Sequence, residues 1–72
     1  MMIDYKSRLQ ELIQSQEQRI PTYHVTGTRG PDHIKTFDVE VRLGNTVLGS
    51  GSGKSKKVAE TEAARHALES LS

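Results

Sequence analysis

The alternation of apolar and polar residues over residues 36–43 limits, more than any other feature, how this chain can fold. Apolar side chains occupy every second position, at Phe37, Val39, Val41 and Leu43, with other residues between them. In an extended chain a period of two places all four on one face, so the segment is predicted to be a strand with one buried and one solvated face. The buried face needs a second layer of structure to cover it.

The next segment predicts a hairpin and a strand with one bare face. Gly44 and Asn45 separate residues 36–43 from residues 46–53, and glycine at the first central position suits a two-residue turn. Within residues 46–53, glycine occupies every second position, at 49, 51 and 53. A strand face without side chains indicates that something bulky packs closely against it, and a helix is the natural candidate.

Both ends of the chain have helical periodicity. Residues 4–17 begin at Asp4, which suits an N-cap, and end before Pro21; their apolar positions are Tyr5, Leu9, Leu12 and Ile13. Ser55 is the second N-cap residue, and the apolar stripe after it is Val58, Ala59, Ala63, Ala64, Ala67, Leu68 and Leu71. Between the helices, residues 23–26 are predicted as a first strand and residues 27–32 as a loop. The order predicts an α+β fold, an α-β-β-β-α two-layer sandwich with a three-stranded antiparallel sheet and two helices packed on one face.

Composition limits the functions open to a chain of 72 residues. Such a chain forms one domain, predicted over residues 1–72, in which residues 1–3 are a disordered or added leader. A domain of this length buries only about 60% of its extended surface. An apolar fraction of 33% without Trp leaves little volume for a closed pocket, so no small-molecule substrate is expected. The chain has no Cys, no apolar run long enough to span a membrane and no secretory signal, so we expect a cytoplasmic domain without membrane contact.

Three lysines at the start of the last helix form the strongest candidate binding feature. The net charge is only +1, but Lys54, Lys56 and Lys57 lie within four residues that contain no acid. The start of a helix has amides without partners and a positive dipole, so it attracts phosphate, while lysine there is unfavourable for the helix itself. A merely solvated surface is the alternative, and the clustering favours anion binding over it.

Two further groups carry weaker signals. The run Gly30, Pro31, Asp32 and His33 has the composition of an ordinary turn. The amides of Gln10 and Gln14 share one face of the first helix and suit base edges and ribose hydroxyls, although an ordinary polar helix surface has the same composition.

Together these features resemble the double-stranded-RNA-binding domain, and in particular the one at the C-terminus of bacterial ribonuclease III. The resemblance extends from Asp4 to Leu71 and is carried by residues 4–11, 21–23, 30–33, 48–57, 59–60 and 63–64, together with Phe37, Val39 and Val41. It implies a partner, double-stranded RNA, and RNA-binding residues at Gln10, Gln14, Pro31, His33, Lys54, Ser55, Lys56 and Lys57.

In this family three regions contact one face of the duplex. The resemblance implies that the first helix enters one minor groove, the loop after the first strand enters the next, and the lysines meet phosphates across the intervening major groove. Such a domain covers about 16 base pairs. Glu60 departs from many family members, which have Lys there, but an acid is common in the ribonuclease III branch. It removes one phosphate contact, so weak binding by the isolated domain is expected.

The resemblance also implies a parent enzyme. It predicts a substrate-recruiting part of a homodimeric ribonuclease III that acts in RNA processing, rRNA included. Magnesium is expected only in a catalytic domain outside these residues, and the domain itself is expected to be a monomer without a cofactor. A protein-interaction or dimerisation module of the same fold is the alternative.

No catalytic constellation is evident in this chain. Asp38 and Glu40 share one strand face, but Arg42 follows at the same spacing, which favours cross-strand charge pairs on a solvated face. The histidines lack metal-ligand spacing. We therefore expect no enzymatic activity from these residues alone.

Overall fold

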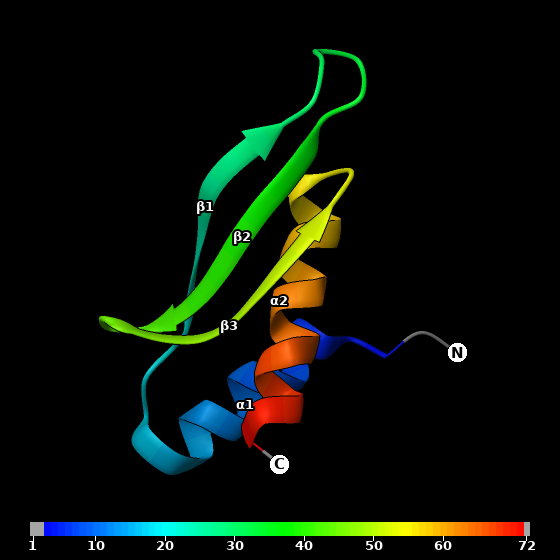
Figure 1. The fold of residues 1–72 in the computed structure, drawn as a ribbon. Helices are drawn as coiled ribbons and strands as arrows, with labels where there is room; N and C mark the ends of the chain where they lie inside the picture. Colours follow the sequence, from blue (N-terminus) through cyan, green and yellow to red (C-terminus); the bar gives the residue numbers. More distant parts are fainter. Residues whose placement is uncertain (1–2, 72) are drawn as a thin grey trace.

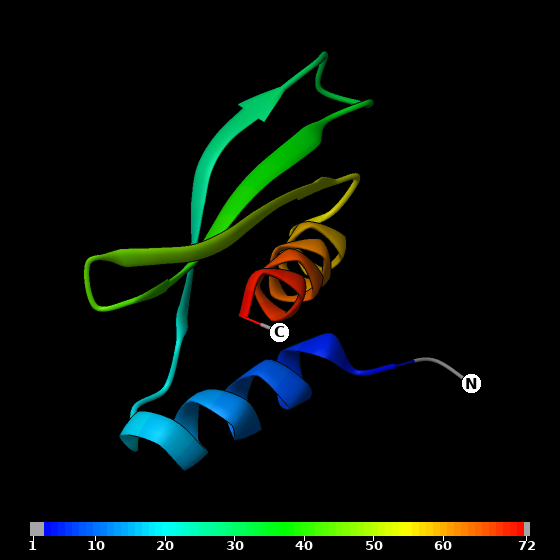
Figure 2. The same ribbon diagram turned by 60° about the horizontal axis from the view of Figure 1, so that its bottom comes forward.

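The computed structural model describes residues 3–71, which form two helices and a three-stranded sheet (Figure 1). The elements are α1 (Tyr5–Glu17), β1 (Thr22–Arg29), β2 (Thr36–Leu43), β3 (Thr46–Gly53) and α2 (Lys56–Leu71). The sheet is antiparallel in the order β1-β2-β3, and both helices lie on the same side of it (Figure 2). The α-β-β-β-α sandwich predicted from the sequence is confirmed. Of the expected leader, residues 1–2 lie outside the described residues and Ile3 is exposed.

Strand β2 is the centre of the sheet, as its alternation predicts. Val39 and Val41 are 1% and 0% exposed, Leu43 is buried, and Phe37 is packed against the same core. The core is completed by Leu9 and Ile13 of α1 and by the alanines of α2. The structure therefore buries one face of β2 against the helices and leaves the other face polar.

The bare face of β3 lies directly under α2, and this confirms the close helix packing expected from the glycines. A Cβ atom on Gly49 would lie 2.7 Å from the Ala67 backbone nitrogen, and one on Gly53 would lie 2.9 Å from that of Ala59. Four alanines of α2 face this strand and the core with no exposed surface, namely Ala59, Ala63, Ala64 and Ala67. The buried apolar stripe of α2 is shorter than predicted, because Val58 and Leu71 at its two ends are 49% and 44% exposed.

The prediction for β1 was wrong at its C-terminal end. The strand does not stop at Thr26 but continues to Arg29, so the loop before β2 covers residues 30–35 rather than 27–32. Thr28 pairs with Phe37 and Arg29 with Thr36, after an irregularity in register between Val25 and Gly27. In the sequence alone, Gly27 indicates the end of a strand. In the structure it follows a bulge, and β1 goes on pairing with β2 beyond it.

The first helix has the predicted start. The Asp4 carboxylate accepts a hydrogen bond from the Ser7 backbone amide at 3.1 Å, which makes Asp4 the N-cap. The helix ends at Gln18, whose φ of 56° is left-handed, three residues before Pro21. Among the elements of residues 3–71, α1 packs mainly against α2.

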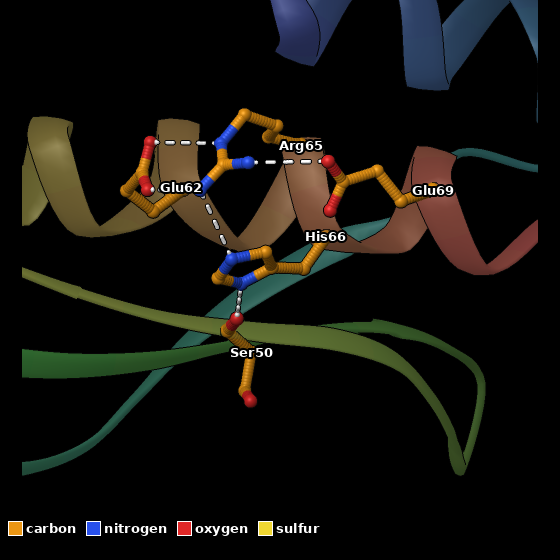
Figure 3. Close-up of polar contacts among 5 residues, drawn as sticks. All are labelled: Ser50, Glu62, Arg65, His66 and Glu69. Carbon is orange, nitrogen blue, oxygen red and sulfur yellow. Dashed lines mark hydrogen bonds and ion pairs between the residues drawn. The ribbon is translucent and has the colours of Figure 1, made fainter.

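Polar contacts along the outer side of α2 reach the edge of β3 through His66 (Figure 3). Arg65 bridges Glu62 and Glu69, and the His66 Nδ1 donates to the Ser50 carbonyl oxygen at 2.6 Å. The guanidinium of Arg65 donates to His66 Nε2 at 3.2 Å, so this nitrogen accepts and the proton is on Nδ1. His66 is thus a structural residue that satisfies a backbone carbonyl of an edge strand.

Candidate nucleic-acid interface

The start of α2 presents three ammonium groups to solvent. Ser55 Oγ accepts from the Val58 amide at 3.1 Å, so this residue is the N-cap that the sequence predicts. Lys54, Lys56 and Lys57 are all exposed, and within residues 3–71 no carboxylate forms an ion pair with any of them. Three unpaired positive charges therefore add to the positive end of the helix dipole.

The other two sequence-predicted regions are exposed as well. Gln10 and Gln14 lie on the surface of α1. In the loop before β2, the Pro31 carbonyl accepts from the Ile34 amide at 2.9 Å, which forms a turn with His33 near its tip. Gly30 precedes this turn with a φ of 95°, a left-handed conformation that favours glycine. Pro31 and His33 both face solvent.

Parts of all three regions follow one another along one side of the molecule, but of the two glutamines only Gln10 lies in the first half of α1, and Gln14 is one turn further along the helix. In both views the loop before β2, the start of α2 and the first half of α1 succeed each other from the top downward (Figures 1 and 2). Gln10 and Lys57 line the same depression of about 550 Å³ between the two helices. The loop before β2 does not line that depression and lies at one end of the molecule (Figure 1).

The contact between Lys6 and Glu60 is the feature of this region that the sequence analysis missed. Lys6 Nζ lies 2.5 Å from Glu60 Oε1, so the carboxylate that departs from the family's lysine is already paired within the domain. The same ammonium lies 4.8 Å from the centroid of the Tyr23 ring. Burial, and then the negative charges of Glu60 and Asp4, raise the pKa of the Tyr23 hydroxyl to about 12.

The solvated face of the sheet carries paired charges, and the predicted cross-strand pairing is confirmed for Asp38 with Arg29, whereas Glu40 and Arg42 pair along β2. Asp38 accepts hydrogen bonds from Arg29 at 2.9 and 3.0 Å and from Ser52 at 2.6 Å, and these partners hold the pKa of its carboxyl below the usual value. Glu40 is paired with Arg42 at 2.8 Å. Over residues 3–71, no group of three or more His, Cys, Asp or Glu side chains is placed to hold a metal ion.

The chain is a small α+β domain whose exposed cation cluster suits a polyanionic partner. The family model described as the double-stranded RNA binding motif matches residues 5–71, and the chain belongs to that family. It is a double-stranded-RNA-binding domain, as its resemblance to the family predicted. Neither helix of the described chain has the length and apolar character to cross a membrane.

Known proteins similar to this chain include both enzymes and separate domains. Ribonuclease 3 of Dehalococcoides mccartyi is 55% identical over 67 residues, which cover 93% of this chain and 28% of that enzyme. The structure of Dicer from Pichia stipitis matches with a TM-score of 0.75 and 35% identity, over 92% of this chain and 32% of that one. The dsRBD2 domain of DRB4 matches with a TM-score of 0.67 and 39% identity, over 96% of both chains.

Proposed function

We propose that this domain binds double-stranded RNA by its shape and backbone, largely irrespective of sequence, through three regions on one side of the fold. The first is Gln10 and Gln14 on α1, the second is the loop with Pro31 and His33, and the third is the lysine cluster at the start of α2. The observation that supports this most is the exposed, unpaired state of Lys54, Lys56 and Lys57 at a helix N-terminus.

The chemistry of each region suits a different part of an A-form duplex. Side chains do not reach base edges in the deep, narrow major groove, where phosphates are the available partners, and lysine binds them as a flexible point charge. The wide minor groove displays 2′-hydroxyls, which both donate and accept hydrogen bonds, as do the amides of Gln10 and Gln14. The lysines therefore supply attraction, and the glutamines and the His33 loop distinguish RNA from DNA. Ser55 orients the helix start by capping it.

The parent protein is proposed to be a ribonuclease III. This chain spans 28% of the length of the Dehalococcoides mccartyi relative, so catalysis belongs to a part of such a protein outside these residues. In this proposal the domain recruits duplex substrate for a magnesium-dependent endonuclease that is homodimeric and cytoplasmic and acts in RNA processing, including that of rRNA. The domain by itself is a monomer that needs no cofactor.

Binding to duplexes of unrelated sequence, measured by fluorescence anisotropy at several salt concentrations, tests the proposal. Changing Lys54, Lys56 and Lys57 together to Ala should weaken binding to all duplexes alike. Each lost phosphate contact should also reduce the slope of log K against log salt by roughly 0.9, the value calibrated on duplex DNA. Changing Gln10 and Gln14 to Ala should instead leave the slope unchanged and reduce the preference for RNA over DNA.

Arg42→Ala is the control. It removes a cation from the sheet face that the helices do not cover, where Arg42 is paired with Glu40. It should leave RNA binding unchanged. If the triple lysine variant binds duplexes as the parent does, the proposed interface is wrong. If the parent chain forms dimers and has no affinity for duplex RNA, a protein-interaction module is the better assignment.

A further inference from the structure

The ion pair between Lys6 and Glu60 joins the two helices that carry the proposed RNA contacts. Lys6 lies in the first turn of α1, and Glu60 lies in the second turn of α2, 54 residues further along the chain. Their side chains are 40% and 26% exposed, so the pair is partly shielded from solvent. Because the Lys6 ammonium also lies over the Tyr23 ring, it contacts β1 as well as α2.

The pair lies one helical turn from both contact regions. Gln10 follows Lys6 by four residues, and Glu60 follows Lys57 by three, spacings that place each couple on the same face of its helix. Lys6, Gln10 and Lys57 all line the depression of about 550 Å³ between the helices. Any movement of α1 along α2 at this point changes the separation between Gln10 and the lysine cluster.

Apolar contacts also hold α1 in place. Leu9 and Ile13 anchor the helix in the core, and such contacts are not directional. An ammonium that is hydrogen-bonded to a carboxylate at 2.5 Å depends on the alignment of both helices. The ion pair adds a directional contact between the elements that carry Gln10 and Lys57.

We propose that Lys6 and Glu60 are positioning residues for duplex recognition, which hold α1 and α2 at the separation that lets both contact one duplex at the same time. This inference rests on the proposed function and deepens it. It assigns to Glu60 a role opposite to the one its charge suggests. Removing an acid from beside the lysine cluster raises the net charge by one, and simple attraction of a polyanion then predicts tighter binding. Positioning predicts weaker binding to duplexes and a smaller preference for them over single strands.

The experiment compares binding of duplex and single-stranded RNA at one salt concentration for the parent chain, Glu60→Gln, Lys6→Gln and the double variant. The double variant has the net charge of the parent, so a difference between these two proteins does not come from net charge. We expect the ratio of duplex to single-strand affinity to fall about two- to fivefold in Glu60→Gln and in the double variant. A change of this size is what the loss of a partly exposed ion pair produces. Glu11→Gln is the control for the charge change, because Glu11 is exposed on α1 away from this contact.

Thermal melting of each variant separates positioning from loss of the fold. The pair is partly exposed, so all variants should be folded at the temperature of the binding assay. Glu60→Asp retains the charge and shortens the side chain, and it should also reduce the duplex preference. An unchanged duplex preference in folded Glu60→Gln and double variants overturns the inference and leaves the proposed function standing. A parent chain that does not prefer duplexes overturns both.

Discussion

An alanine at position 51 would test how closely α2 packs on the sheet. The added Cβ of Gly51→Ala would lie 2.7 Å from two atoms of Glu62 and still closer to the Ala63 amide nitrogen, whereas ordinary van der Waals contact begins at 3.4 Å. Because these neighbours are mainly helix backbone, α2 itself has to move away from β3. Overpacking of this kind lowers the free energy of unfolding. Alanine also makes the unfolded chain stiffer, which gives back a smaller amount, and the net loss is about 2 kcal/mol. The domain's total stability is roughly 4–11 kcal/mol from its length, so this is a large share of it.

Thermal melting followed by circular dichroism measures the effect. For a domain of this size, about 2 kcal/mol lowers the melting temperature by about 8–16 °C. Gly27→Ala is the matched control, because a Cβ there would meet only the Asp38 carboxylate at 3.8 Å, an ordinary contact. It should melt at or slightly above the parent temperature. If Gly51→Ala also melts no lower than the parent, the close packing of α2 on β3 does not limit stability and the reasoning fails.

Two further predictions concern stability. Ser55→Ala removes the side chain that caps α2 and should cost about 1 kcal/mol, seen as a melting temperature lower by about 4–8 °C; an unchanged value would show that the cap contributes nothing. The pKa of Asp38 is lowered below 3.8 by Arg29 and Ser52, so its stabilising effect is present above that pH and is lost as pH falls through the lower, folded-state pKa. Urea unfolding between pH 5 and 2 should therefore show falling stability in the parent and a shallower fall in Asp38→Asn.

Local patterns were sufficient to predict most of the fold. The alternation in β2, the two-residue turn at Gly44 and the caps at Asp4 and Ser55 depend on short-range geometry, and each was confirmed. The glycines of β3 predicted that a helix packs closely on that strand, but they did not indicate which residues of the helix contact each glycine. The end of β1 was missed because its last residues are held by pairing with β2, which no local signal at Gly27 reveals.

In the candidate site, too, contiguous features were predictable from the sequence and long-range contacts were not. The lysine cluster is contiguous in sequence, so its exposure at a helix start was predictable from residues 54–57 alone. The Lys6–Glu60 contact was not, because 54 residues separate its members and each has ordinary polar neighbours. Glu60 was interpreted from the sequence as the loss of a phosphate contact. The structure adds that its charge is paired across the helices, which only the tertiary packing determines.

The glycine–alanine contact between β3 and α2 also affects the entropy of folding. Fixing a buried Leu or Ile costs about 0.5–1 kcal/mol in lost rotamers, whereas Gly and Ala have no rotamers to lose. Only four large side chains are fully buried among residues 3–71, namely Leu9, Ile13, Val39 and Val41. At the glycine–alanine contact itself, docking the longest helix onto the sheet therefore orders no side-chain torsions, whereas His66 of the same helix is ordered by its bond to the Ser50 carbonyl. In a domain with so little apolar volume, this smaller entropy loss partly offsets the limited hydrophobic burial.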